Sequence, residues 1–180
     1  PDGTAITLGY DQAGRPSTLR LPRGQVAFGY HPTTGNLTTI TDPDGKTLSY
    51  DYDGSLLTRE TWAGTISGNI KYTYDDDFQL TSQSVNGDSS LTFLYDEDSL
   101  LTQVGALAFS RDSQIGHITG STLGHVVDAR AYNSFGELST YRATFGGNDI
   151  FAVQYTRDQL GRIIQKTETV EGQAIAYSYT

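Results

Sequence analysis

The stretch QYTRDQLGRII, residues 154–164, has the features of a turn between two strands. Asp158 ends an alternating segment, and Gly161 follows three residues later. An Asp at the entrance of a turn can accept hydrogen bonds from the backbone beyond it, and Gly supplies the positive φ that tight turns need. Looser copies, FSRDSQIGHI at 109–118 and GYDQAGRPST at 9–18, predict that the chain is one short unit copied many times.

A Tyr-Asp pair, or a substitute for it, recurs along the whole chain, and we call the first residue of each pair the anchor. Successive anchors lie 20, 20, 24, 21, 16, 21 and 25 residues apart, and Tyr179 follows the last of them by 22. This period predicts a single array over residues 1–180, made of about eight units of roughly 21 residues and cut from a longer chain. The predicted repeat-defining residues are Tyr10, Asp11, Gly14, Tyr30, Gly35, Tyr50, Asp51, Gly54, Tyr74, Asp75, Tyr95, Asp96, Arg111, Asp112, Gly116, Tyr132, Gly136, Arg157, Asp158 and Gly161.

The residues before each anchor alternate between apolar and small or polar types, as in IKYTY at 70–74. A period of two predicts a strand with one apolar face. The copy at Tyr132 is an exception, because Asp128 and Arg130 fall on the face that should be apolar, and the sequence gives no reason for it.

A second strand and a second turn complete each unit. Thr- and Ser-rich segments such as LTTIT at 37–41 follow the turn Gly, and hairpin signals such as DPDGK at 42–46, VNGDS at 85–89 and VEGQ at 170–173 close the unit. The predicted fold class is all-β, with tandem antiparallel β-hairpin repeats. About 16 strands exceed the number that an open twisted sheet holds without curling, so we expect a curled, spiralling sheet in a shell-like array.

Composition excludes several classes of protein. A formal net charge of −9 argues against nucleic-acid binding, which needs clustered Lys and Arg. The absence of Cys removes disulfides and thiolate metal sites. No apolar run is long enough for this segment to insert into a membrane.

No constellation of catalytic or cofactor-binding residues is visible. The three His residues are scattered, and GxSxG, HExxH and P-loop patterns are missing, so we predict no catalytic residue, no cofactor and no enzyme activity. The acidic runs at 75–77 and 96–98 could hold calcium, but they match no EF-hand loop and are interpreted as solvated turns, so no metal site is predicted.

Two further expectations concern single residues. Trp62, the only Trp, could form a glycan platform with the Tyr residues, although packing across strands is the favoured interpretation. Gly161 is expected to need a positive φ, whereas Gly120, which lies off the period, is expected to tolerate substitution better.

The segments YDQAGRP at 10–16 and TRDQLGRI at 156–163 resemble the motif of the RHS or YD-repeat family, and YDYDGSL, YDDDFQL and YDEDSLL are looser copies. The family includes bacterial polymorphic toxins, shell-forming components of insecticidal toxin complexes, wall-associated proteins and the teneurin receptors. The resemblance implies a β-sheet strip that spirals into a hollow shell, which encloses a toxin domain or supports adhesion. About eight repeats are too few to close such a shell.

The resulting functional hypothesis is a non-catalytic structural scaffold, secreted or at the cell surface of a bacterium. Its expected partners are the remaining repeats and the enclosed or flanking domains of the parent protein. The alternative is a carbohydrate- or receptor-binding module that uses exposed aromatic residues. The last strand, with Ile175, Tyr177 and Tyr179 on one face and little charge, is expected to self-associate edge to edge.

Overall fold

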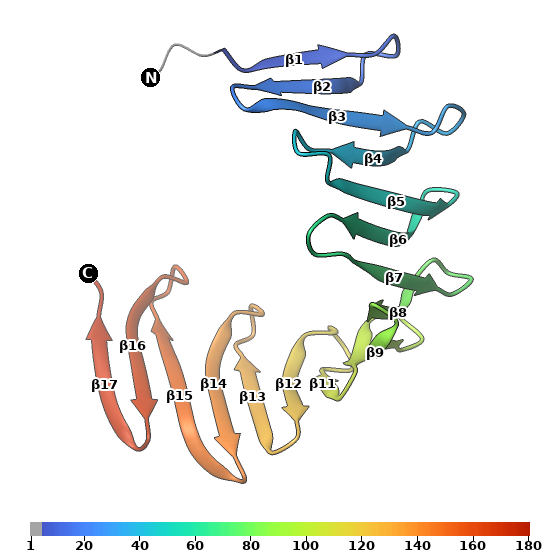
Figure 1. The fold of residues 1–180 in the computed structure, drawn as a ribbon. Coiled ribbons are helices and arrows are strands. Elements are labelled where there is room, and N and C mark those ends of the chain that lie inside the picture. The colour runs from blue at the N-terminus through green and yellow to red at the C-terminus, as the bar shows by residue number, and fades with distance from the viewer. Residues whose placement is uncertain (1–4) are drawn as a thin grey trace. The chain divides into compact units, whose positions relative to one another are not determined.

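The computed structural model describes residues 5–180, and every regular element in that range is a β-strand. None of the described residues forms a helix that could cross a membrane. The strands follow one another in chain order, as Figure 1 shows, which confirms the all-β fold class. They are β1 (Thr7–Tyr10), β2 (Pro16–Leu21), β3 (Gly24–Tyr30), β4 (Leu37–Thr41), β5 (Thr47–Asp53), β6 (Leu56–Ala63), β7 (Gly68–Tyr74), β8 (Leu80–Val85), β9 (Asp88–Tyr95), β10 (Leu101–Val104), β11 (Leu107–Arg111), β12 (Ile118–Leu123), β13 (Val126–Tyr132), β14 (Leu138–Phe145), β15 (Asn148–Arg157), β16 (Ile163–Val170) and β17 (Gln173–Ser178).

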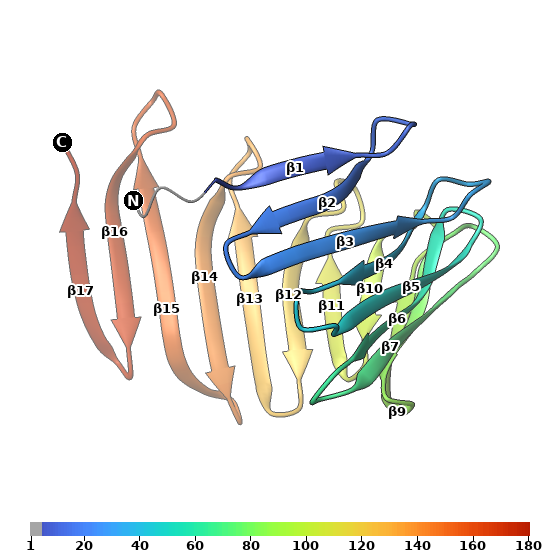
Figure 2. The ribbon, with the colours of Figure 1, turned by 45° about the horizontal axis from the view of Figure 1, so that its top comes forward.

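Each strand pairs antiparallel with the next strand in the sequence, so the repeats form an up-and-down meander. Contacts between residues divide the chain into two compact units, 1–92 and 93–180, with the boundary inside β9. In a meander, alternate turns lie at the same edge of the sheet. The turns that follow the anchors therefore share one edge of each unit, as the views in Figures 1 and 2 show.

A β-bulge recurs next to the anchors in both units. Two residues of the second strand oppose one residue of the anchor strand at this point, which bends the strand and re-aims its side chains. Because the bulge recurs at the same place, it holds the anchor in the same position in successive repeats. The register shifts immediately before Tyr10, Tyr30, Tyr74, Arg111, Tyr132 and Arg157.

The third copy has a different register from the one predicted. Its bulge lies between Asp51 and Tyr52, so Tyr52, rather than the predicted Tyr50, occupies the anchor position. The turn that follows is a tight hairpin in which Asp53 pairs with Leu56, and the predicted Asp51 does not organise it. Tyr52 lies 22 residues from both Tyr30 and Tyr74, so this correction makes the period more regular.

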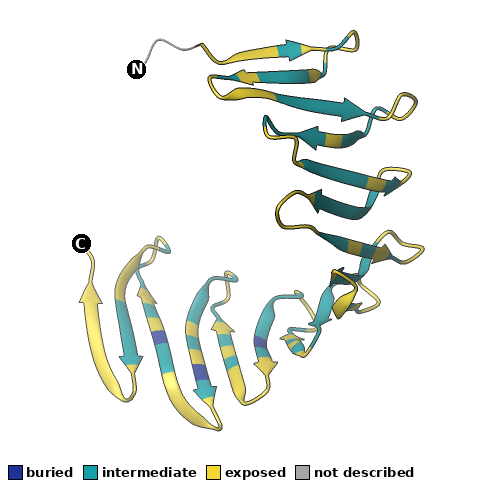
Figure 3. Cartoon of the chain, viewed as in Figure 1, coloured by how far each residue is buried: buried dark blue, intermediate teal, exposed yellow. Residues whose placement is uncertain are grey.

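Each unit is a single layer of strands. Within a unit, strands contact only their neighbours in the sequence, and among the described residues the only buried hydrophobic side chains are Ala143 and Val153. Figure 3 shows half-buried strands, with β17 exposed along its whole length. The chain exposes 12,348 Å², whereas a compact monomer of this mass exposes about 8,600 Å². Stability therefore comes mainly from contacts between adjacent strands instead of a central core.

The alternation predicted before the anchors is present, since Ile70, Tyr72 and Tyr74 are half-buried while Lys71 and Thr73 are exposed. This half-buried side of the sheet is called the anchor face below.

The exceptional copy at Tyr132 follows the same alternation, with charges paired on the anchor face. Asp128 accepts a hydrogen bond from the Ser121 hydroxyl and pairs with Arg130 at 3.2 Å. The Arg130 guanidinium lies 5.8 Å from the centroid of the Tyr141 ring. A half-buried charge is stabilised by partners of this kind, and the neighbouring strands β12 and β14 supply them.

Gly120 is buried in β12, contrary to the expectation that it is a tolerant position. A Cβ atom there would lie 2.5 Å from the carbonyl oxygen of Asp128 on β13. Glycine is required at this position because β12 and β13 approach each other closely, and not because of the turn period. A larger residue requires the backbone to move.

Candidate functional site

Seven turns within the described chain share one pattern, in which an Asp or Asn side chain organises the loop. In the turn at Asp158, Oδ1 accepts hydrogen bonds from the amides of Leu160 and Arg162, both at 2.9 Å. The Asp158 amide donates to the Arg162 carbonyl at 2.9 Å, and the Gly161 amide donates to the Asp158 carbonyl at 3.1 Å. The other side chains that accept two turn amides are Asp11, Asp42, Asp75, Asp96, Asp112 and Asn133.

The position of the turn Gly has a left-handed backbone in all these turns. Gly161 has φ of +79° and Gly136 has φ of +76°, as glycine permits. Phe78 and Ser99 occupy the same position in their own turns with φ of 63°, although they are not glycine. The Asp side chain therefore imposes this turn even where the sequence departs from the repeat motif.

The pKa values of Asp11 and Asp158 are held below their usual range. For Asp158 the largest cause is the hydrogen bond from the Arg162 side chain, whose Nε lies 2.7 Å from Oδ2. For Asp11 the largest cause is the backbone amide of Arg15. In both turns the charged carboxylate is the form that the fold prefers.

Three anchor tyrosines connect their repeat to the one before it. The Tyr30 hydroxyl donates to the Pro16 carbonyl at 2.7 Å, and the Tyr132 hydroxyl donates to the Ile118 carbonyl at 2.8 Å. Pro16 and Ile118 begin the second strands of the preceding repeats. Tyr74 makes the corresponding bond, 2.9 Å long, to the Leu57 carbonyl.

Arginine anchors make the same connection. Arg157 Nη1 donates to the Leu138 carbonyl at 2.8 Å, and Arg111 donates to the Leu101 carbonyl through Nε at 3.2 Å and Nη2 at 3.0 Å. The Arg157 guanidinium also lies 5.7 Å from the Tyr155 ring centroid. The bond to the preceding repeat was not predicted, because sequence spacing does not show which carbonyl an Arg reaches.

The residue after the turn Gly reaches forward to the next repeat. The Arg15 guanidinium lies 4.4 Å from the centroid of the Tyr30 ring, and the His117 ring lies 4.9 Å from the Tyr132 ring. A Cβ on Gly136 would lie 3.0 Å from Cε1 of His117, so a larger residue there would require the His117 ring to shift by a few tenths of an ångström.

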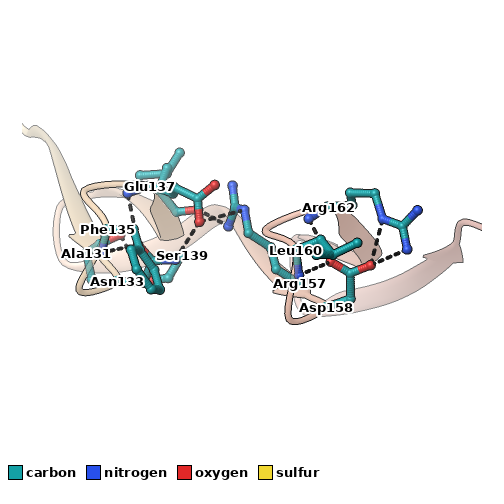
Figure 4. A network of polar contacts seen from close by, with 10 residues as sticks. Ala131, Asn133, Phe135, Glu137, Ser139, Arg157, Asp158, Leu160 and Arg162 are labelled. Atoms are coloured by element: carbon teal, nitrogen blue, oxygen red, sulfur yellow. Dashed lines mark hydrogen bonds and ion pairs between the residues drawn. The ribbon is translucent and has the colours of Figure 1, made fainter.

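Figure 4 shows this connection where the anchor is an arginine. Glu137, the residue after the turn Gly, accepts a hydrogen bond from Asn133 at 2.7 Å and pairs with Arg157 of the next repeat at 3.4 Å. Tyr30 thus follows an Arg and Tyr132 a His, whereas Arg157 follows a Glu. The turns, anchors and post-glycine residues together form the candidate functional site, which joins repeat to repeat.

Grooves lie between successive turns. In unit 93–180, one of about 740 Å³ lies between the turns at Asn133 and Asp158, and one of about 480 Å³ lies between those at Asp96 and Asp112. In unit 1–92, a hollow of about 270 Å³ lies between His31 and Gly54. Asn36 connects the two turns there, because its Nδ2 donates to the Gly54 carbonyl at 2.9 Å.

Trp62 lies away from these grooves, near the opposite edge of its unit. It is half-buried in β6, where it pairs with Leu48 and Gly68 and lines a hollow of about 400 Å³. Its ring packs over Gly68, where a Cβ atom would collide with it. No group of three His, Asp or Glu side chains converges as a metal site in residues 5–180.

A model of the Teneurin YD-shell family matches residues 1–180. No curated protein matches the sequence. A crystal structure titled TcdB2-TccC3-Cdc42 resembles 99% of this chain with a TM-score of 0.51 and 18% identity. A structure of TcdB2-TccC3-TEV resembles 92% of it with a TM-score of 0.58 and 12% identity.

These structural similarities concern the fold, since the identities are low. The chain corresponds to 12% and 11% of the lengths of the two solved chains.

Proposed function

The chain belongs to the teneurin YD-shell family. On that premise we propose that it is a non-catalytic structural segment of a β-sheet shell in a secreted or cell-surface bacterial protein. Its partners are the other repeats of a single array and a toxin or adhesion domain that the shell encloses or supports. The twenty repeat-defining positions predicted from the sequence are structural residues in this proposal, with Tyr52 replacing Tyr50 as the third anchor.

One observation carries the proposal, namely that the recurring polar side chains of the repeat join one repeat to the next. Anchor side chains of both types, Tyr132 and Arg157, bond to a backbone carbonyl of the preceding repeat. The carboxylate of Asp158 is occupied by turn amides and Arg162. Side chains engaged in this way stabilise the sheet and are not available as acids, bases or nucleophiles.

Deletion of one repeat tests the scaffold. Removing residues 112–132 joins Arg111 to Asn133 and takes out two turns together with β12 and β13. A repeat scaffold should remain folded and all-β by circular dichroism, with a denaturant m-value reduced in proportion to the lost surface. An unfolded product would contradict the proposal, and a deletion of 112–122, which breaks the period, is the control that should unfold.

Electron microscopy of the parent protein tests the shell. Density for this segment should line a cavity, and a segment lying on the outside of a solid body would contradict the enclosing role.

A glycan-binding role is the second candidate, favoured by the hollow beside Trp62. Aromatic rings bind the apolar faces of sugars. A glycan array should identify a ligand whose binding is lost in Trp62→Ala and kept in Tyr95→Ala, if this role exists. Failure of any glycan to bind would leave Trp62 with its packing role alone.

We also expect the free edge of β17 to associate with a second copy of the chain. β17 pairs only with β16 in the described chain, is exposed throughout, and contains no charged residue, Pro or bulge to discourage pairing. Light scattering should show association that increases with concentration, and Tyr177→Lys should suppress it. A wild-type chain that stays monomeric at high concentration would contradict this expectation.

A further inference from the structure

Three successive turns of unit 93–180 present a large apolar side chain at the same position. Ile115, Phe135 and Leu160 each precede the turn Gly, and they are 60%, 85% and 77% exposed. Their amides donate to the turn Asp or Asn at 3.1, 3.0 and 2.9 Å. The backbone of each apolar residue is therefore held rigidly while its side chain lies in solvent, and we call these three residues the apolar tips.

The groove beside Ile115 is acidic. It contains Asp96, Asp98, Asp112 and Arg111, so three carboxylates face one guanidinium group, and Arg111 is already engaged by the Leu101 carbonyl. In the groove between Phe135 and Leu160 the charges balance, because Glu137 pairs with Arg157 and Asp158 pairs with Arg162. A ligand with apolar and cationic groups complements this surface.

The spacing of the tips selects the secondary structure of the ligand. Consecutive tips are two strands apart, or about 9.6 Å at 4.8 Å per strand. Residues i and i+7 of an α-helix lie on one face and about 10.5 Å apart. In an extended strand, about 10 Å corresponds to three residues, which point to opposite faces. A helix laid across the strand ends can therefore contact all three tips, whereas a strand cannot.

We propose that the edge formed by Ile115, Phe135 and Leu160 docks a basic amphipathic α-helix of a partner polypeptide. Apolar side chains at heptad spacing contact the tips, one of them entering the groove between Phe135 and Leu160, and flanking Lys or Arg side chains face the carboxylates beside Ile115. This docking role does not depend on whether a shell encloses a toxin or supports adhesion.

The test uses the 180-residue chain and a synthetic helical peptide of three heptads, with Leu at positions a and d and Lys elsewhere, titrated by calorimetry. The double variant Phe135→Ser/Leu160→Ser removes exposed side chains and leaves the turn hydrogen bonds, so it should stay folded and lose at least tenfold in affinity. Phe78→Ser, which removes a single exposed apolar residue from a turn of unit 1–92, is the matched control and should bind as the wild type does.

Two further peptides test whether binding depends on the charge and the apolar stripe of the peptide or only on nonspecific attraction. A peptide with Glu in place of Lys, and a scrambled peptide with the same Leu and Lys content but no apolar stripe, should each bind at least tenfold more weakly. Equal binding of the scrambled peptide, equal binding by the double variant, or no binding of the amphipathic peptide at millimolar concentration would overturn the proposal. Loss of self-association in the double variant, with unchanged peptide binding, would assign the edge to a second copy and also overturn it.

Discussion

The turns at 96–100 and 158–162 have only their Asp in common, yet they fold alike. Asp96 accepts the amides of Asp98 and Leu100 at 3.0 and 2.9 Å, and Asp158 makes the equivalent bonds, both at 2.9 Å. The two turns differ in their connections. Ser99 adopts the left-handed backbone that Gly161 adopts without strain, and Leu100 lacks the carboxylate bond of Arg162. The Asp therefore specifies the turn, while Gly and Arg reduce its strain and strengthen it.

The largest effect should come from Arg157, the anchor that joins the turn at 158–162 to the preceding repeat. Arg157→Ala removes the bond to the Leu138 carbonyl and leaves Glu137 without its ion pair, so the free energy of unfolding should fall by about 2–3 kcal/mol, as for hydrogen bonds of charged groups. Arg157→Tyr should recover part of this loss, because Tyr132 makes the same kind of bond to Ile118. Urea unfolding measures both, with the exposed Arg23→Ala as control. A Tyr variant no more stable than the Ala variant would show that the anchors are not equivalent.

The shared Asp should be the next most costly position. Asp96→Ala deprives two turn amides of their acceptor and should cost about 1–2 kcal/mol, the usual effect of losing a side-chain cap. Asp96→Asn should be nearly neutral, because Asn133 keeps both turn bonds with an amide oxygen. Thermal unfolding of the two variants measures the difference. If Asn proves as harmful as Ala, charge rather than hydrogen bonding holds the turn.

The sequence was sufficient to predict the repeat, the hairpins and most anchors, because Asp, Gly and alternation act locally. It misplaced the third anchor, where YDYDG contains two overlapping Tyr-Asp pairs and only strand register distinguishes Tyr50 from Tyr52. It also misjudged Gly120 and left Asp128 and Arg130 without a reason, since each depends on a neighbouring strand: Gly120 on β13, Asp128 on β12 and Arg130 on β14. The bonds between repeats were missed for the same cause: side chains reach backbone atoms 10 to 19 residues away.

Glycine should stabilise the looser turn. Ser99 has φ of 63°. Ser99→Gly should relieve the strain of this left-handed backbone, and it should also increase the entropy of the unfolded chain. The first effect outweighs the second, so the free energy of unfolding should rise by about 0.5 kcal/mol. The same change at Ser113, a turn residue not among those with positive φ, should be destabilising because only the entropy term remains. Chemical denaturation of the two variants compares them directly. A Ser99→Gly chain less stable than the wild type would mean that the serine makes a compensating contact.

The smallest effect concerns pH and the turn at 158–162. The pKa of Asp158 is lowered in the folded state, first by the hydrogen bond from the Arg162 side chain and then by turn amides. A carboxyl whose folded pKa lies below its unfolded value, about 3.9 for Asp, stabilises the fold above that pH and loses this contribution as the pH falls through the folded pKa.

Asp158→Asn should therefore make the decline in stability below about pH 4 shallower, while leaving stability near pH 7 slightly reduced by loss of the Arg162 pair. Arg162→Gln should flatten the same region less, because the amides of Leu160 and Arg162 still favour the carboxylate. Unfolding curves between pH 2.5 and 7 for the three chains decide the matter, and identical slopes would show that Asp158 titrates alike in the folded and unfolded states.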